Sequence, residues 1–319
     1  MRAAVLTAHG EPPSYAEHPD PVAREGHVLV RITAAPVVPL DLLCASGTSY
    51  FGEPALPYVP GVQGVGVDEA GERVWVAASA GMKPGDGTLG ELYVAAPDDV
   101  VPVPGDAPDA DVAAIGLSGV AAWSAVNLRA QLRTGETVMV LGAGGAVGQV
   151  AVAVAARQGA GRIVGVCRGA AGADRARRNG ADEVVVLPDD RDPTTLAALL
   201  HEALGTTADV VIDPVFGWIA EAATRVMTPF GRLVNIGGSA ADSATLSSAV
   251  VRGKSLSVLG YTNNAITPEQ RAEALNGAVG LWSPGRSVVE HTVRPLAEVT
   301  DAWQDQARGT AAGRQVLVP

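Results

Sequence analysis

Hydrophobic and polar positions change their pattern along the chain after about residue 112. In the first stretch, short apolar runs alternate with turns rich in proline and glycine, which is typical of strands joined by loops. The expected strands lie at 3–6, 28–32, 62–67, 73–77 and 91–95. This pattern predicts an irregular, β-rich first domain.

Between residues 113 and 265, apolar strands alternate with helical stretches. Helices are predicted over 145–158, before Gly159, and over 173–179, before Gly180, because glycine commonly ends a helix. Six strands joined by helices predict an α/β fold with a doubly wound parallel sheet and right-handed crossovers. The expected strands lie at 137–141, 162–167, 183–187, 210–212, 232–236 and 255–259.

The remainder of the chain is expected to rejoin the first domain. A helix is predicted over 269–278, and two strand-like runs follow at 288–293 and 315–318. The predicted domains are therefore residues 1–112 together with 266–319, and residues 113–265.

Composition and charge exclude several classes of function. The chain has 319 residues, 47% hydrophobic and 18% charged, which is typical of a soluble protein with a sizeable core. Its net charge of −11 repels phosphate backbones and anionic lipid, so we expect neither nucleic acid nor a membrane as a partner. Cys44 and Cys167 are too few for a disulfide framework or a four-cysteine metal site.

No apolar stretch looks long enough to span a bilayer. The Ala/Val run at 147–156 has about half the required length. The first residues do not resemble a signal peptide, because the apolar run after Arg2 is too short. We therefore expect a cytoplasmic protein.

The strongest chemical signal is a glycine-rich turn between the strand at 137–141 and the next helix. A dinucleotide-binding turn needs small residues because the backbone must approach a pyrophosphate, and the helix start then offers unpaired N–H groups to that anion. In the G-x-G-x-x-G frame the key positions are Ala143, Gly145 and Gly148, so the first glycine is replaced. An ordinary tight turn is the alternative. The expected cofactor contacts are Ala143, Gly144, Gly145, Ala146, Val147 and Gly148.

The end of the following strand indicates which dinucleotide binds. An Asp or Glu that bonds the ribose hydroxyls of NADH is expected about 20 residues beyond the turn. Cys167 occupies that place and Arg168 follows it. A guanidinium can bind a 2′-phosphate with two hydrogen bonds, and no carboxylate is there to repel it, so we expect NADPH rather than NADH. A solvated Arg168 at the strand end is the alternative.

Short motifs spread over nearly the whole chain resemble one enzyme family. They are MRAAV at 1–5, PYVPG at 57–61, GERV at 71–74, GELY at 90–93, GAGGAVG at 142–148, NGAD at 179–182, GRLV at 231–234 and GRQV at 313–316. On these motifs the chain resembles the medium-chain dehydrogenase/reductase superfamily, in its quinone oxidoreductase branch. The resemblance implies a GroES-like β-rich domain plus a Rossmann domain with a six-stranded parallel sheet, and an active site in the cleft between the domains.

The resemblance and the Rossmann topology together imply further cofactor contacts. In such sheets the carboxyl ends of the strands line the ligand crevice. The residues expected to flank the nicotinamide and ribose follow three of the predicted strands, and the C-terminal motif adds one arginine. They are Pro214, Val215, Ile236, Gly237, Gly238, Tyr261, Thr262, Asn263 and Arg314.

The resemblance also shows a departure from the zinc-dependent members of the superfamily. Those enzymes carry a Cys and a His as metal ligands in the first domain. By their spacing to Asp41 and to the PYVPG motif, these positions are Val38 and Val62 here. Valine has no metal-ligating atom, so we expect no catalytic zinc.

Relatives without zinc transfer hydride from NADPH to an activated C=C bond or a quinone. We therefore expect reduction of a quinone, enone or related conjugated carbonyl, with Tyr50 as the candidate that polarises the substrate carbonyl or supplies a proton. Asp41 is the second candidate for the catalytic site, although capping of the following turn is its preferred role. Val38 stands where many quinone oxidoreductases carry Asn, which suggests a specialised substrate.

Other functions stay open from the sequence alone. The protein is alternatively a biosynthetic enoyl or ketone reductase that tailors a natural product, a non-enzymatic NADPH-binding redox sensor, or a redox-neutral cyclase or lyase. The strand at 255–259 is expected at a sheet edge, where an apolar strand invites pairing across a two-fold axis. We therefore expect a homodimer through this strand.

Overall fold

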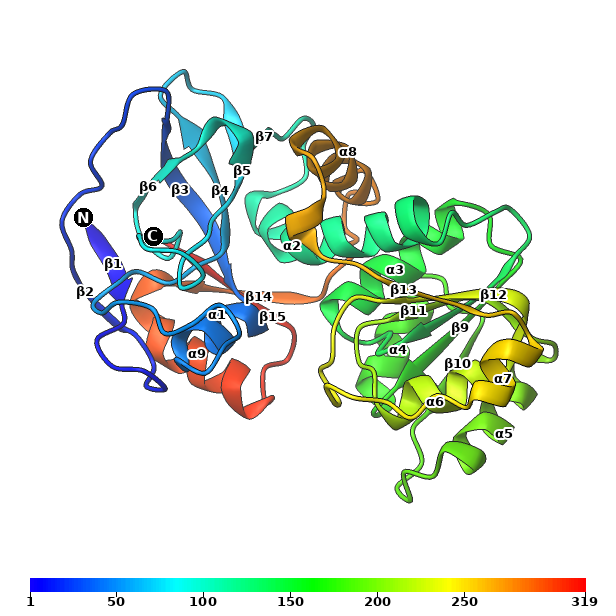
Figure 1. The fold of residues 1–319 in the computed structure, drawn as a ribbon. Coiled ribbons are helices and arrows are strands. Elements are labelled where there is room, and N and C mark those ends of the chain that lie inside the picture. Colours follow the sequence, from blue (N-terminus) through cyan, green and yellow to red (C-terminus); the bar gives the residue numbers. More distant parts are fainter. The chain divides into compact units, whose positions relative to one another are not determined.

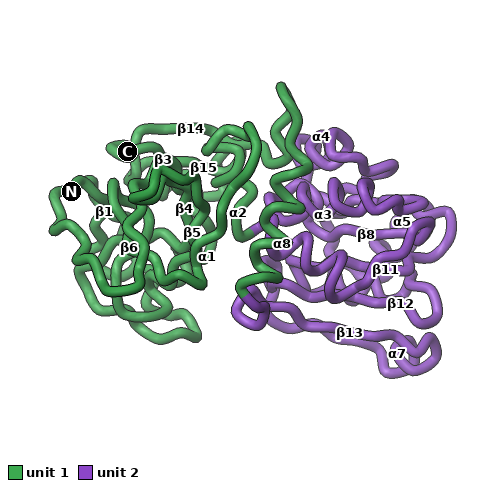
Figure 2. Tube along the Cα trace, turned by 90° about the horizontal axis from the view of Figure 1, so that it is seen from above, with its two compact units in different colours: residues 1–117, 268–319 green, residues 118–267 purple.

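The computed structural model describes all residues 1–319 and divides into two compact units. Unit 1 comprises Met1–Leu117 and Pro268–Pro319, and unit 2 comprises Ser118–Thr267 (Figure 2). The sequence analysis placed these divisions at 112/113 and 265/266.

Unit 2 contains a six-stranded parallel sheet in the order β10-β9-β8-β11-β12-β13 (Figure 1). The predicted doubly wound sheet is therefore confirmed, and the last strand lies at an edge as expected. The strands are β8 (Thr137–Leu141), β9 (Arg162–Cys167), β10 (Glu183–Val186), β11 (Ala208–Asp213), β12 (Met227–Asn235) and β13 (Ser257–Gly260). The helices are α3 (Ala146–Arg157), α4 (Ala170–Arg178), α5 (Pro193–Leu204), α6 (Trp218–Arg225) and α7 (Ser248–Gly253).

Helices α5 and α6 cover one face of this sheet. Leu196 and Leu200 of α5 and Ile219 of α6 belong to one buried apolar cluster with Met139 and other strand residues. Removing such side chains from water is the main force that holds a helix on a sheet.

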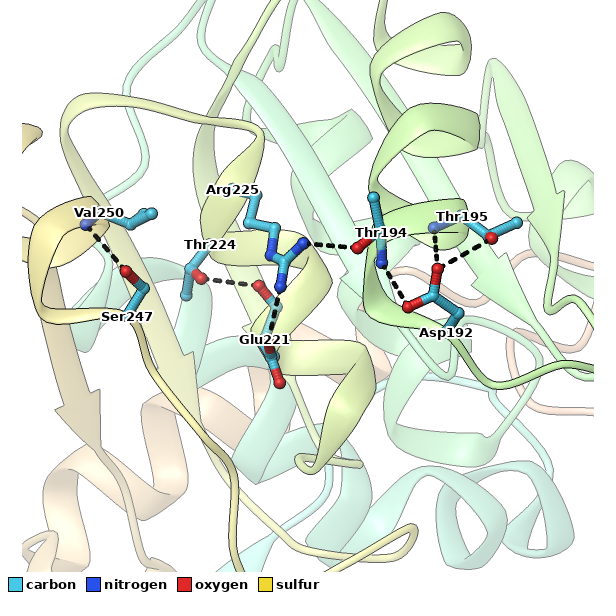
Figure 3. Close-up of polar contacts among 8 residues, drawn as sticks. All are labelled: Asp192, Thr194, Thr195, Glu221, Thr224, Arg225, Ser247 and Val250. Carbon is cyan, nitrogen blue, oxygen red and sulfur yellow. Dashed lines mark hydrogen bonds and ion pairs between the residues drawn. The ribbon is translucent and has the colours of Figure 1, made fainter.

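Polar contacts fix the same two helices to each other at their solvent side (Figure 3). The Asp192 carboxylate accepts hydrogen bonds from the backbone N–H groups of Thr194 and Thr195, which caps the start of α5. The Arg225 guanidinium donates to the Thr194 hydroxyl at 3.0 Å and pairs with Glu221 at 2.7 Å, which joins α6 to α5.

Unit 1 is built around a seven-stranded sheet. Its order is β14-β15-β3-β4-β5-β7, with β6 paired to β3, and a separate hairpin joins β1 (Arg2–Val5) to β2 (Ser14–Glu17). The sheet strands are β3 (Val28–Val37), β4 (Gln63–Asp68), β5 (Arg73–Ala77), β6 (Leu92–Ala95), β7 (Val100–Pro102), β14 (His291–Pro295) and β15 (Arg314–Val318). The helices are α1 (Pro39–Ala45), α8 (Pro268–Val279) and α9 (Val299–Arg308).

The C-terminal strand completes this sheet. Strand β15 pairs antiparallel with β3, and Leu317 lies in the same apolar core as Ile32, Val76 and Trp303. The expected return of the chain end to the first domain is thus observed. The GroES-like β-rich domain beside a Rossmann domain is confirmed by solved structures of the same fold, which are described below.

Helix α2 (Asp109–Ser124) corrects one expectation from the sequence. Together with the π-helical turn that follows, the segment Asp109–Arg129 is long and apolar enough to cross a membrane by length and composition, where the sequence analysis found no such stretch. The large apolar residues of this segment alternate with Ala, Gly and Ser, so the sequence analysis did not recognise it as one long apolar stretch. Of its most apolar 18-residue window, 72% is buried inside the protein, as in the core helix of a folded domain.

Candidate functional site

The glycine-rich turn lies at the switch point of the unit 2 sheet. Strand β8 is the first strand of this sheet in the chain, with β9 and β10 on one side and β11, β12 and β13 on the other. Ligands of doubly wound sheets bind beyond the carboxyl ends of the strands at this point, because the connecting helices diverge there. The turn at 142–148 directly follows the carboxyl end of β8.

Two glycines of this turn are needed for packing within the protein. A Cβ atom at Gly148 would lie 2.2 Å from the Gly142 oxygen and 2.6 Å from the Ala143 Cα atom. A Cβ atom at Gly144 would lie 2.4 Å from the Gly172 Cα atom. Both contacts are far shorter than van der Waals distances, so these positions let α3 and α4 approach the turn closely.

Gly145 differs from these two glycines because the space that a side chain would fill there is open. A Cβ atom there would meet only the Gly142 oxygen, at 3.4 Å, and the residue is exposed. Gly145 is the N-cap of α3, without a side-chain cap and without an acidic residue in the first turn. The N–H groups and the partial positive charge of this helix start therefore point to a site that no side chain covers, as an anion-binding turn requires.

The end of β9 brings together a buried thiol and exposed arginines. Cys167 is buried and burial raises the pKa of its thiol, whereas Arg168 is exposed and forms no hydrogen bond or ion pair within the chain. Positive charges from Arg177 and Arg175 on α4 also act on the thiol and oppose the effect of burial. Arg177 escaped the sequence analysis, although the arginine run on the α4 segment could have indicated it.

The segments that follow β11 and β12 are ordered by hydrogen bonds and lie beside the glycine-rich turn. The buried Asp213 carboxylate accepts hydrogen bonds from the Val215 and Phe216 N–H groups, at 3.0 and 2.7 Å. The Asn235 side chain donates to the Gly237 oxygen at 2.9 Å. A Cβ atom at Gly142 would lie 2.8 Å from Val215 Cγ1, so the β11 end packs directly on the turn.

The remaining predicted contacts of these strand ends occupy the same region of unit 2. The Ile236 N–H donates to the Asp213 oxygen at 2.9 Å, and a Cβ atom at Gly237 would lie 3.1 Å from the Pro214 oxygen. Gly238 is tightly packed, because a Cβ atom there would lie 2.8 Å from the Ala241 oxygen. The structure therefore brings Pro214, Val215, Ile236 and Gly237 together around the β8 turn.

The residues after β13 are held to the neighbouring strand end. The Tyr261 N–H donates to the Asn235 oxygen at 3.0 Å, and its hydroxyl donates to the Asn263 Oδ1 atom at 2.7 Å. Thr262 accepts a hydrogen bond from the Asn264 N–H at 3.3 Å. These contacts order the segment locally, and a role for Tyr261, Thr262 and Asn263 toward the cofactor stays a prediction.

Asp41 is built into the interior of unit 1. Its carboxylate accepts hydrogen bonds from the N–H groups of Val38, at 2.7 Å, and Val62, at 2.9 Å. Only 2% of the residue is exposed, and burial raises the pKa of the carboxyl to about 7 despite these hydrogen bonds. Asp41 therefore joins the start of α1 to the segment before β4, in keeping with the preferred structural role.

Arg314 is the charged group that balances Asp41. It lies at the start of β15, and burial lowers the pKa of its guanidinium to about 10 while the Asp41 charge acts in the opposite direction. The two residues lie far apart in sequence, and their charges interact because β15 joins the unit 1 sheet. A contact of Arg314 with the cofactor stays a prediction.

Tyr50 occupies a very different environment from Asp41. Its side chain is 82% exposed, and its ring lies against Phe51 with a centroid distance of 4.1 Å. The structure therefore places one catalytic candidate in solvent and the other in the core. Two further titratable side chains, Tyr58 and Cys44, lie buried near Asp41, and the sequence analysis did not place them together. Burial raises the pKa of the Tyr58 phenol, and it raises the pKa of the Cys44 thiol to about 11.

Comparisons with known proteins agree with this architecture. A family described as zinc-binding dehydrogenase matches residues 146–277. Quinone oxidoreductase of Lama guanicoe is 29% identical over 100% of this chain and 97% of that protein. Quinone oxidoreductase of Thermus thermophilus, solved also in complex with NADPH, has a TM-score of 0.78 at 29% identity, with both chains fully covered. Over its whole length the chain is similar to quinone oxidoreductases, which agrees with the resemblance to the medium-chain dehydrogenase/reductase superfamily. It is an oxidoreductase.

A further relative within the superfamily is a much larger protein. A phenolphthiocerol/phthiocerol polyketide synthase chain of Mycobacterium tuberculosis is 28% identical over 91% of this chain, which corresponds to 13% of the synthase chain. The chain thus resembles both a free-standing oxidoreductase and one segment of a polyketide synthase.

The two side chains at the expected zinc position do not fit a zinc ion. Val38 and Val62 are buried, their side chains have no metal-ligating atom, and their backbone N–H groups both donate to the Asp41 carboxylate. The chain contains no group of three or more His, Cys, Asp or Glu side chains that could hold a metal ion. Val38 and Val62 therefore supply no zinc ligand from their side chains.

Proposed function

We propose that this protein is an NADPH-dependent reductase of quinones, enones or related conjugated carbonyls that works without zinc. The observation that carries the proposal is the uncapped, exposed start of α3 at the switch point of a doubly wound sheet. That arrangement supplies fixed N–H donors to a diphosphate at the position where this fold binds dinucleotides.

The preference for NADPH rests on charge at the end of β9. An exposed guanidinium at Arg168 and a buried, uncharged thiol at Cys167 suit a 2′-phosphate better than two ribose hydroxyls. Arg177 adds positive charge from α4. The related Thermus thermophilus enzyme, which forms a complex with NADPH, supports the same choice.

When bound, NADPH supplies the hydride for the reduction. The residues of this chain bind and orient it: the Gly145 turn holds the diphosphate, and Arg168 holds the adenosine end. The product also needs a proton, for which the exposed Tyr50 hydroxyl is the proposed donor.

Measurement of cofactor affinity tests the proposed role of Arg168. In Arg168→Ala we expect NADPH to bind about 10- to 100-fold more weakly, because a hydrogen bond to a charged group contributes about 1.5–3 kcal/mol. NADH, which lacks the 2′-phosphate, should bind as to the wild type. The exposed Arg157→Ala on α3 is a charge-matched control. An equal loss for both dinucleotides would remove Arg168 from the 2′-phosphate site.

Turnover tests the reaction itself. Purified protein should oxidise NADPH in the presence of members of a quinone and enone panel, and dialysis against a chelator should leave the rate unchanged. Loss of activity on chelation, restored by zinc, would contradict the zinc-free reaction. Binding of NADPH without oxidation by any panel member would favour the sensor, and turnover without NADPH consumption would favour a cyclase or lyase.

The similarity to a polyketide synthase segment supports a second candidate function. The protein would then be an enoyl or ketone reductase acting on a biosynthetic intermediate. Activity on conjugated thioesters with none on simple quinones would favour this candidate, and the opposite result would favour the first.

A further inference from the structure

A buried carboxylate in unit 2 organises the turn that follows β11. Asp213, the last residue of β11, is fully buried. Its Oδ1 atom accepts hydrogen bonds from the backbone N–H groups of Val215, at 3.0 Å, and Phe216, at 2.7 Å. Its Oδ2 atom accepts one from the Asn235 side chain at 3.3 Å. One side chain thus fixes the backbone of residues 214–217, the β11 turn, as in an Asx-turn.

The β11 turn contains a residue in an unfavourable backbone conformation. Phe216 has φ 58°, in the left-handed region that bulky side chains rarely adopt. Such a residue stays there only where the surrounding structure requires it, and residues of this kind gather at ligand sites. The N–H of Phe216 makes the shorter of the two backbone hydrogen bonds to Asp213, so the carboxylate acts on the strained residue itself.

The β11 turn is also fixed to its neighbours in unit 2. The Ala240 N–H, in the segment after β12, donates to the Val215 oxygen at 2.8 Å. The Val215 side chain packs on the glycine-rich turn, because a Cβ atom at Gly142 would lie 2.8 Å from Val215 Cγ1. A shift of the β11 turn would therefore move a side chain that borders the proposed dinucleotide site.

The strand order indicates which part of the dinucleotide the β11 turn would meet. Arg168, which is proposed to bind the adenosine end, follows β9, and the proposed diphosphate site at Gly145 follows β8. Strand β11 lies next to β8 on the side away from β9. A dinucleotide that extends along the carboxyl ends of these strands from β9 to β8 continues toward β11, so its nicotinamide half reaches the β11 turn.

We infer that Asp213 is a positioning residue for hydride transfer. It holds the β11 turn against the glycine-rich turn and thereby sets where the nicotinamide half of bound NADPH lies. Asp213 itself is buried and acts through Val215. The inference rests on the proposed function, because it requires NADPH along these strand ends, whereas the order of the β11 turn in the free protein does not depend on it.

Cofactor fragments separate this role from a general loss of stability. In Asp213→Ala we expect the NADPH Kd to rise about tenfold and kcat to fall at least about tenfold, because a displaced nicotinamide reacts slowly. The Kd of adenosine 2′,5′-bisphosphate, which lacks the nicotinamide half, should stay within about twofold of the wild type. Amide hydrogen exchange of Val215 and Phe216 in the free protein should accelerate at least about tenfold.

Two further variants test the same role with less damage to the core. Asp213→Asn keeps an Oδ1 acceptor for both backbone N–H groups, so exchange and kcat should return toward the wild type. Val215→Ala shortens the side chain on the glycine-rich turn and leaves the carboxylate and its hydrogen bonds in place. It should lower kcat several-fold without changing the affinity for adenosine 2′,5′-bisphosphate, and it carries the test if Asp213→Ala does not fold.

Asp209→Ala is the matched control. Asp209 lies near the other end of β11, and its carboxylate accepts a backbone hydrogen bond from Thr137 at 2.8 Å. Its loss should leave kcat, both affinities and exchange in the β11 turn unchanged.

The inference is overturned if the Asp213→Ala and Val215→Ala variants keep the wild-type kcat, if fragment affinity falls as much as NADPH affinity, or if Asp209→Ala gives the same losses. A wild type that binds no NADPH would instead refute the proposed function and this inference together.

Discussion

Two glycines of the dinucleotide turn should respond to the same substitution in opposite ways. Gly145 and Gly148 lie three residues apart at the start of α3, and each can be changed to alanine. At Gly145 the added methyl group meets only the Gly142 oxygen, at 3.4 Å, which is an ordinary contact. At Gly148 it would lie 2.2 Å from the same oxygen.

The expected magnitudes follow from these distances. Gly145→Ala should change stability little, because a less favourable N-cap is offset by about 0.4–1 kcal/mol gained from a more restricted unfolded chain. Its methyl group would instead enter the open space where the proposed site binds the diphosphate. Loss of one or two charge-assisted hydrogen bonds of about 1.5–3 kcal/mol each should weaken NADPH binding about 10- to 100-fold or more.

Gly148→Ala should mainly destabilise the protein. Helix α3 must move by about 1 Å to relieve the clash, and overpacking of this kind costs about 1–3 kcal/mol. For a protein of this size the melting temperature falls by about 2–4 °C for each kcal/mol. Fluorescence titration with NADPH and thermal unfolding of both variants measure the two effects. Wild-type affinity in Gly145→Ala, or wild-type stability in Gly148→Ala, would refute the assignment of the turn.

Two further predictions concern unit 1 and the sheet edge. Because burial raises the pKa of Asp41 from 3.8 to about 7, the native protein holds a proton there at pH values where the unfolded chain has released it. The free energy of unfolding of the wild type, compared with that of Asp41→Asn, should therefore fall as the pH rises from about 4 to about 7. The fall should reach up to about 1.4 kcal/mol per pH unit and should level off above that range. Urea unfolding across this range measures it, and a constant difference between the two proteins would contradict the raised pKa. For the proposed homodimer, β13 offers an unpaired edge on which Val258 is 43% exposed. Val258→Lys should shift the protein to a monomer in sedimentation, whereas Val186→Lys on the opposite edge strand should not, and equal behaviour of both variants would remove β13 from the interface.

Local sequence patterns were sufficient to predict most elements of both units. The six strands of unit 2 and the turn at Gly145 were recognisable because apolar runs, glycine stops and a strand-to-helix glycine motif involve only neighbouring residues. The alternation of strands and helices predicted a parallel sheet, and the strand-like run at 315–318 was expected to rejoin the first domain; both are observed. Boundaries were less accurate: β3 extends to Val37, and β14 begins at His291.

What the sequence by itself determined is therefore the order of elements and the place of the dinucleotide turn. Only the tertiary structure decided that Asp41 holds both Val38 and Val62, that Tyr50 lies in solvent, and that Gln63 bonds to Leu117. The physical reason is separation along the chain. A strand or a turn depends on residues a few positions apart, whereas the partner of a buried carboxylate or amide is set by which distant backbone groups the folded sheets bring within hydrogen-bond distance.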